Sequence, residues 1–258
     1  MDRSLRSASP HPPAPSARVP PSPACGGGPG WGLAERVLYR DGLILIIDKP
    51  AGIAVHPGPG GGPNLEAQFA ELRFGLPHPP ALAHRLDRDT SGCLVLGRHA
   101  KALRRLGLLF AAGKVEKLYW AVAAGRPAEE AGRIETGLKK LTRRTGWKMV
   151  VDPDGQRAVT DYRVLGSEGG RSWLELRPRT GRTHQIRVHC AALGCPVIGD
   201  RVYGEAGQGP LLLHARRITL PLYPARPPIA AAAPVPRHML AALERLGYDE
   251  TRTEANPQ

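Results

Sequence analysis

The stretch 84–96, HRLDRDTSGCLVL, places a dense set of polar side chains directly in front of an apolar run. Its last four residues, 93–96, are all apolar, which predicts a buried strand. The residues before them carry one histidine, two arginines, two aspartates and two hydroxyls. Functional side chains concentrate on loops that a rigid scaffold holds in place. We therefore expect the fold to form around this strand and the chemistry to lie in the loop before it.

The remainder of the chain predicts more strands than helices. A second apolar run at 43–47 is closed by Asp48-Lys49-Pro50 and is also typical of a buried strand. In 115–123, alternate residues including Tyr119 fall on one face. Further strands are predicted at 160–165, 173–177, 211–214 and 217–220, and helices at 64–74, 101–112, 183–193 and 236–246. Because strands and helices do not strictly alternate, the pattern favours an α+β fold with a largely antiparallel or mixed sheet.

The composition predicts one domain between two tails. Residues 1–30 consist largely of Pro, Ser, Ala and Gly and are expected to be a disordered tail. The domain is predicted to span 31–247, and 248–258 to be a frayed C-terminal tail. No apolar run approaches the length of a membrane span, and no secretory signal follows the first arginines. Four cysteines without a C-x-x-C pattern indicate reduced thiols, so we expect a cytoplasmic protein without a membrane partner.

The charge points to a polyanionic partner. Lys and Arg number 36 against 23 Asp and Glu, a formal net charge of +13. Such an excess is typical of nucleic-acid binding, whereas 5% aromatic residues argue against a protein that binds single strands mainly by stacking. The basic residues of 139–144 are either phosphate contacts or a solvated loop.

A second polar cluster lies at 179–189, RTGRTHQIRVH, at the start of a predicted helix. A helix N-terminus surrounded by cations is suited to bind an anion. His184 and Arg187 are three residues apart and are expected to share a helix face. The alternative is a solvated basic helix face.

Within the first cluster, Asp87 lies between Arg85 and Arg88, whose charges favour an ionised carboxylate. An oriented carboxylate can act as a nucleophile or stabilise charge, or it can simply hold a turn closed by Gly92. Two other chemistries fit poorly. The spacing of the candidate zinc ligands His184, His189, Cys190 and Cys195 matches no closed zinc pattern. A hydrolase nucleophile at Ser91 lacks the G-x-S-x-G elbow.

These two clusters resemble the signatures of the RluA-type family of RNA pseudouridine synthases. The first signature is matched by HRLD with the following TSG, and the second by GRTHQIRVH at 181–189. Shorter matches occur in the family order, at 48–52, 117–119, 199–204 and 213–215. The resemblance extends from about Leu38 to Leu222.

The resemblance implies a mixed, mostly antiparallel central sheet with flanking helices and a central active-site cleft. It implies an isomerase that converts uridines of structured RNA, either tRNA or rRNA, to pseudouridine. Asp87 would be the essential aspartate, Tyr119 the active-site tyrosine, and Arg187 the arginine that pairs with the aspartate. Arg85 would displace the target base. The remaining RNA contacts are expected from His84, Arg88, Arg182 and His184.

The implied reaction breaks the bond from ribose to the uracil nitrogen, turns the base and rejoins it through carbon. Nothing is oxidised and no group leaves the site, so no cofactor or metal is expected. Uracil can leave as a delocalised anion, so that one carboxylate suffices where a retaining glycosidase uses two. RNA is the expected partner of a monomer without an obligate protein partner. The alternatives are a non-catalytic RNA-binding protein on the same scaffold and an unrelated hydrolase.

Overall fold

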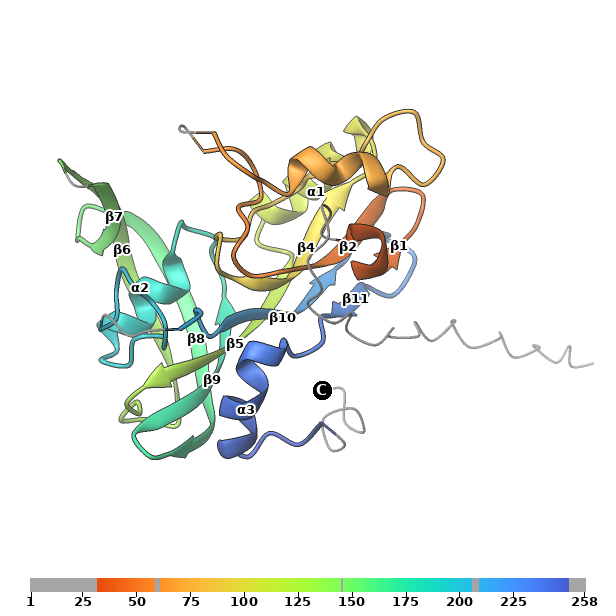
Figure 1. Cartoon of the computed structure of the whole chain (residues 1–258). Coiled ribbons are helices and arrows are strands. Elements are labelled where there is room, and N and C mark those ends of the chain that lie inside the picture. The colour runs from red at the N-terminus through yellow and green to blue at the C-terminus, as the bar shows by residue number, and fades with distance from the viewer. Residues whose placement is uncertain (1–31, 59–60, 145, 206–208, 251–258) are drawn as a thin grey trace, which may run out of the picture.

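The computed structural model describes residues 32–58, 61–144, 146–205 and 209–250, and shows one mixed sheet with a few helices (Figure 1). The sheet has eleven strands in the order β1-β2-β4-β10-β5-β9-β8-β6-β7, with β11 beside β10 and β3 beside β4. The strands are β1 (Val37–Arg40), β2 (Ile44–Lys49), β3 (Ala81–Leu82), β4 (Ser91–Gly97), β5 (Glu116–Ala124), β6 (Ala131–Arg143), β7 (Gly146–Val151), β8 (Gln156–Glu168), β9 (Arg171–Pro178), β10 (Leu213–Leu220) and β11 (Ile229–Ala232). The helices are α1 (Ala100–Ala111), α2 (Gln185–Ala192) and α3 (Arg237–Arg245), with the 3-10 helices η1 (Leu33–Arg36) and η2 (Glu66–Leu72).

The first half of the sheet is built on β2 and β4, which pair antiparallel. Both strands are buried on two faces, which explains their unbroken apolar sequences. Leu94 and Leu96 face the core beneath η2, and Cys93 and Val95 pack with Leu106 of α1 on the other side. β4 also pairs with β10, in parallel. The other described strand pairs are antiparallel, so the sheet is mixed but mostly antiparallel, as expected.

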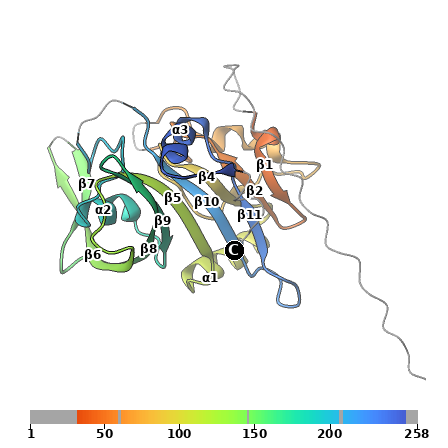
Figure 2. The same ribbon diagram turned by 90° about the horizontal axis from the view of Figure 1, so that it is seen from below.

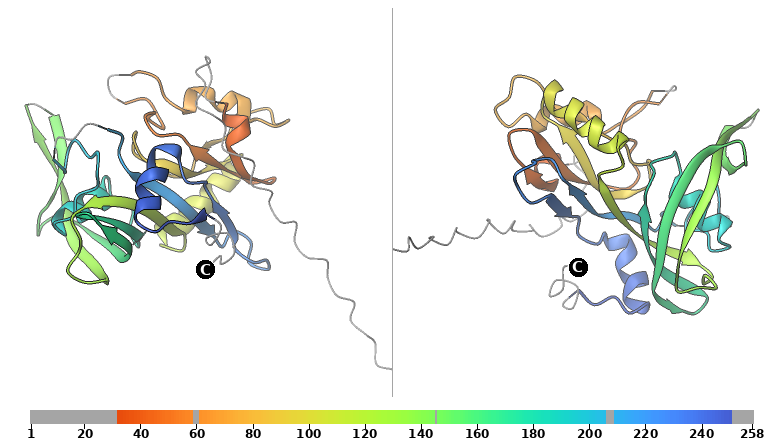
Figure 3. Two further views of the ribbon diagram at one scale, coloured as in Figure 1. Left: turned by 60° about the horizontal axis from the view of Figure 1, so that its bottom comes forward. Right: turned by 180° about the vertical axis from the view of Figure 1, so that it is seen from behind.

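β5 lies in the middle of the molecule and joins the two halves of the sheet, as Figures 2 and 3 show. Its side chains alternate as the sequence predicted. Tyr119 and Ala121 belong to the main core, together with Ile186 of α2. Trp120 and Val122 face the opposite layer, where they pack with Met239 of α3. Tyr119 is thereby placed on the same side of the sheet as α2.

Four sequence predictions need correction. The strands expected at 211–214 and 217–220 form one strand, β10, with a register shift between His214 and Arg217. The helix expected from 183 begins at Gln185, because His184 has a left-handed backbone (φ 52°). The expected helix at 64–74 is the shorter 3-10 helix η2. The basic segment 139–144, for which the sequence allows a solvated loop, belongs to the β6–β7 hairpin. The exposed residues of this hairpin carry too little apolar periodicity to predict a strand.

The predicted N-terminal tail, 1–30, lies outside the described residues, as do 251–258. The predicted start of the C-terminal tail at 248 is too early, because Tyr248 is buried and packs edge-to-face against Trp120 and Trp173. The folded domain therefore extends at least to Tyr248. Across the described residues, no helix has the length and apolar character needed to cross a membrane.

Asp48 at the end of β2 gives a stability prediction. Burial raises the pKa of its carboxyl to about 6, against the opposing charges of Arg36 and Lys49. The protonated carboxyl of Asp48 contributes stability that is fully present below its unfolded pKa of about 4. This contribution is lost as the pH rises through about 6. We expect Asp48→Asn to be more stable than the wild type by about 1–3 kcal/mol near neutral pH. Urea unfolding across the pH range measures this.

The difference between the two proteins should vanish below about pH 3, where the aspartate is protonated in both its folded and unfolded forms. An equal difference at every pH would instead assign the effect to packing or to the Arg36 ion pair, whose Nη1–Oδ2 distance is 3.7 Å.

Candidate active site

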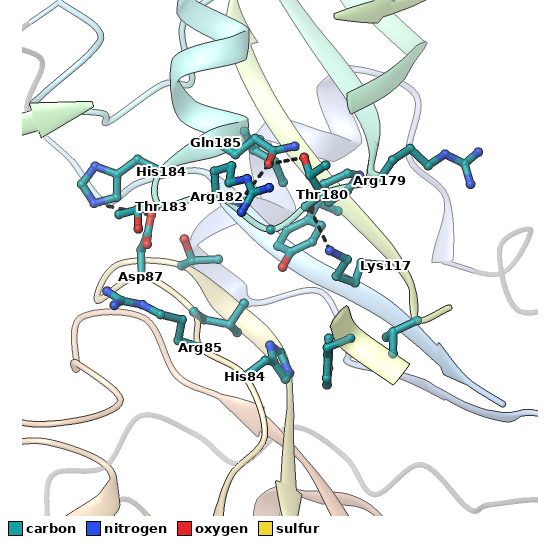
Figure 4. Close-up of a pocket in the computed structure, with 18 of the residues that line it drawn as sticks. His84, Arg85, Asp87, Lys117, Arg179, Thr180, Arg182, Thr183, His184 and Gln185 are labelled. Carbon is teal, nitrogen blue, oxygen red and sulfur yellow. Dashed lines mark hydrogen bonds and ion pairs between the residues drawn. The ribbon is translucent and has the colours of Figure 1, made fainter. Parts of the chain in front are cut away.

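A cavity of about 480 Å³ lies between the loop before β4, the strand β5 and the loop that leads into α2 (Figure 4). The polar cluster of 84–87 forms one wall, and residues 178–187 form the opposite wall. Tyr119 and Lys117 lie along β5 between them. The two sequence clusters, about a hundred residues apart, therefore face each other across one space.

The loop that carries Asp87 is held from behind by Lys49. This lysine is fully buried, and its Nζ donates to the carbonyl oxygens of Pro50, Arg88 and Thr90 at 2.8–2.9 Å. Burial lowers the pKa of Lys49 to about 7, opposed by the charges of Asp89 and Asp87. Satisfying three carbonyls with one buried ammonium fixes the course of the loop.

Gly92 fixes the loop at its other end, where it enters β4. Its φ is +107°, and a Cβ at this position would lie 2.3 Å from the carbonyl oxygen of Ala215 in β10. Glycine is therefore required both by the backbone conformation and by the close approach of β10. The loop thus enters the sheet between β2 and β10 at a fixed position.

Arg187 reaches Asp87 from α2 but is bound more closely to another carboxylate. Its Nε and Nη2 each donate to Asp200 at 2.7 Å, a bidentate pair, while Nη1 lies 3.4 Å from Asp87 Oδ2. Burial raises the pKa of Asp200, but the hydrogen bonds from Arg187 and from two backbone N–H groups outweigh it and lower that pKa overall. The predicted pairing of Arg187 with Asp87 is present, and Asp200 orients the arginine for it.

His184 contributes a second neighbour of Asp87. Its Nε2 lies 3.9 Å from Asp87 Oδ2, and its Nδ1 lies 2.9 Å from the hydroxyl of Tyr203. That hydroxyl accepts from the backbone N–H of Met149, so its own proton is free to bind Nδ1, which favours the tautomer protonated on Nε2, toward Asp87. Burial lowers the pKa of His184, so the ring is neutral near pH 7. The prediction that His184 and Arg187 share a helix face is wrong, because α2 begins at Gln185. Both side chains nevertheless lie close to the Asp87 carboxylate.

The strand β5 supplies the side chains between the two walls. Tyr119 is 9% exposed, and burial, followed by the charge of Asp87, raises its pKa, so the phenol stays protonated. Lys117 donates from Nζ to the carbonyl oxygen of Thr180 at 2.9 Å, and burial lowers its pKa to about 8. An aromatic ring and an amine therefore line the cavity that Asp87 also lines.

Of the predicted RNA contacts described next, three line the cavity and one does not. Arg85 and Arg182 line the cavity and are exposed. His84 also lines it, but its Nε2 accepts from the backbone N–H of Val95 at 3.0 Å, and its ring packs on Phe110. Burial lowers the pKa of His84 to about 4, so it is neutral. Arg88 is not among the residues around the cavity, and its Nε donates to the carbonyl oxygen of Gly52.

The two alternative chemistries would use Ser91 or a metal site. Ser91 is buried, does not line the cavity, and places its Oγ 2.9 Å from Nδ1 of His214. In the described part of the chain, no three His, Cys, Asp or Glu side chains are arranged to hold a metal ion.

Sequence reasoning did not identify Asp200, Tyr203, Lys117 and Lys49 as site residues, although all four lie in the shorter matched motifs. Lys117 lines the cavity itself, whereas Asp200 and Tyr203 act through Arg187 and His184, and Lys49 holds the loop from behind. The sequence position of each residue therefore gives no sign of its contact.

Comparisons with known proteins point to one family. Residues 43–192, more than half of the chain, match the family model for RNA pseudouridylate synthase. An uncharacterized RNA pseudouridine synthase of Zymomonas mobilis is 44% identical over 210 residues, covering 80% of this chain and 95% of that one. The ribosomal large subunit pseudouridine synthase D of Xanthomonas campestris is 36% identical, covering 84% and 70%. The solved structure of human RNA pseudouridylate synthase domain containing 4 aligns with a TM-score of 0.70 at 28% identity, covering 83% and 94%.

The Asp200–Arg187 pair gives a second stability prediction. Removing one partner of a buried pair leaves the other charge uncompensated, so we expect Asp200→Asn to lower the free energy of unfolding by about 3 kcal/mol. Urea unfolding followed by tryptophan fluorescence measures this. Asp161→Asn is the matched control, because Asp161 pairs with two arginines at the surface and should cost at most about 1 kcal/mol. Equal losses in the two variants would contradict the prediction.

Proposed function

This chain belongs to the RNA pseudouridylate synthase family and is an isomerase that acts on RNA, and from this premise we propose that Asp87 is its key catalytic group. One observation carries the proposal. Of the described residues that line the 480 Å³ cavity, Asp87 is the single carboxylate. The reaction needs a carboxylate at the glycosidic bond, and the geometry offers this one.

The isomerisation breaks the bond between ribose C1′ and uracil N1, and it forms a bond between C1′ and C5. The hydrogen on C5 is released as a proton, and N1 gains one, so atoms balance without a cofactor. Asp87 faces the cavity between Arg187 and His184, and the hydrogen bond from Arg187 Nη1 at 3.4 Å orients its Oδ2. A fixed carboxylate next to the sugar favours cleavage of the glycosidic bond, because positive charge develops there.

The neighbouring groups have separate roles in this proposal. Arg187 positions Asp87 through a charge-assisted hydrogen bond and is itself held by Asp200. Tyr119 supplies a flat apolar surface for the uracil ring and a protonated hydroxyl, which would give its proton to N1 and take up the proton released from C5. Both groups come from elements anchored in the core, so the site is preorganised.

We propose that the substrate is a uridine of structured RNA, in tRNA or rRNA. A base inside a helix cannot reach the cavity, so it must be flipped out at a cost of a few kcal/mol. Arg85 lies exposed at the cavity and is suited to fill the vacated stack, and Arg182 to bind a phosphate. The target is found by mapping pseudouridines across the RNA of a deletion strain and looking for the position that is lost.

The first test replaces the carboxylate. We expect Asp87→Asn to abolish pseudouridine formation, measured by tritium release from RNA labelled at uridine C5, while RNA binding stays within about tenfold. Asp89→Asn is the matched control, because Asp89 lies on the same loop, is exposed and does not line the cavity. It should retain most of the activity. Substantial turnover by the Asp87 variant would refute the catalytic role.

The second test separates the ring of Tyr119 from its hydroxyl. In Tyr119→Phe the apolar surface remains and the proton donor is lost. We expect turnover to fall by about a hundredfold with little change in RNA affinity, as general acid–base groups contribute on this scale. Single-turnover rates with saturating enzyme measure the step. A rate equal to that of the wild type would limit Tyr119 to a packing role.

A further inference from the structure

Trp147 is a large apolar side chain that the proposed reaction does not use. It lies on β7, in the β6–β7 hairpin at one end of the sheet, and is 45% exposed (Figure 1). Tryptophan is enriched at binding interfaces, because its ring offers a large apolar surface and its N–H a polar end. The two other described tryptophans, Trp120 and Trp173, are buried against α3.

The hairpin around this ring is strongly basic. Residues 139–151 contain Lys139, Lys140, Arg143, Arg144 and Lys148 and no carboxylate. Lys140 places its Nζ 4.9 Å from the centre of the Trp147 ring, a cation–π contact. Lys139 alone among these has an ion pair in the described structure, with Asp152 just beyond the hairpin at 3.5 Å. An aromatic ring amid exposed cations is the combination that binds a nucleotide by its base and its phosphate.

Trp147 is also next to the cavity. Its ring stacks on the imidazole of His184, with 5.1 Å between centroids and 23° between planes. His184 is part of the cavity wall and faces Asp87. Trp147 is therefore separated from the catalytic space by one side chain. A hydrogen bond also joins the hairpin to the residues around His184. The backbone N–H of Met149 donates to the hydroxyl of Tyr203, which itself contacts His184.

We propose that the β6–β7 hairpin is a second RNA-binding element, in which Trp147 stacks on an unpaired nucleotide next to the flipped uridine. Lys140 and Arg143 bind the adjoining phosphates, and Lys140, on a flexible side chain, leaves the indole as the base arrives. The proposal rests on the proposed function, since it takes RNA as the substrate. It adds a contact outside the cavity that selects RNA whose target uridine has an unpaired neighbour.

Binding is measured in the Asp87→Asn background, so that no turnover enters the result. The probe is a stem–loop RNA with an all-uridine loop, titrated with a fluorescence readout and cross-linked with ultraviolet light. We expect Trp147→Ala to weaken binding about tenfold, because stacking on an aromatic side chain contributes about 1–3 kcal/mol per base. Trp147→Phe should retain most of the affinity. Thr142→Ala, directly opposite Trp147 in the hairpin register, is the matched control and should bind like the parent.

Salt dependence separates stacking from phosphate contact. Trp147→Ala should leave the slope of log affinity against log salt unchanged. The double variant Lys140→Ala/Arg143→Ala should reduce that slope by about 1.4, or about 0.7 for each contact to single-stranded RNA. In the parent, the cross-linked peptide should contain Trp147.

Three results would overturn the proposal. Trp147→Ala could bind as tightly as Thr142→Ala. Trp147→Ala, built with Asp87 intact, could lose turnover without losing affinity, which would limit Trp147 to positioning His184. Poly-glutamate could displace the probe as well as unlabelled stem–loop RNA does, which would assign the hairpin to an acidic protein partner. Failure of the Asp87 role would appear separately, as turnover by Asp87→Asn, and would leave these binding results intact.

Discussion

The Arg187 guanidinium is bound by two carboxylates from different parts of the chain, and the site depends on this arrangement. Asp200 takes the bidentate contact at 2.7 Å, and Asp87 takes a longer contact at 3.4 Å from the remaining nitrogen. A buried ion pair adds little net stability, because desolvation offsets most of the attraction. Its effect here is positional. Asp200 fixes the plane of the guanidinium, and that plane determines where Arg187 can meet the loop that carries Asp87.

The opposite side of Asp87 is fixed by a different kind of contact. Lys49 is buried, and its Nζ binds three carbonyl oxygens of the backbone. It therefore shapes the backbone of the loop and leaves the Asp87 side chain free to face the cavity. With Gly92 admitting β10 at close range, the loop is held at its base and at its exit. Figure 4 shows the Asp87 side chain at the cavity, beside His184.

Local sequence predicted the elements whose burial is uniform. β2 and β4 are buried on both faces, so their apolar runs are unbroken and easy to recognise. β5 alternates because one face meets α2 and the other α3. The β6–β7 hairpin was missed, since its cations face solvent and only a few side chains, such as Leu138 and Met149, pack inward. The sequence predicts His184 on a helix, because hydrophobic periodicity does not reveal that its backbone is left-handed.

The sequence by itself determined the chemical inventory: the carboxylate, the tyrosine and the arginine, the basic character of the chain, and the family to which it belongs. Only the tertiary structure decided which of these groups meet. It selected Asp200 as the main partner of Arg187, turned Arg88 and the ring nitrogen of His84 to backbone contacts, and stacked Trp147 on His184. The physical reason is that a side chain's partners are set by the packing of strands and helices distant in sequence, whereas composition and local period reveal only what is buried and what is charged.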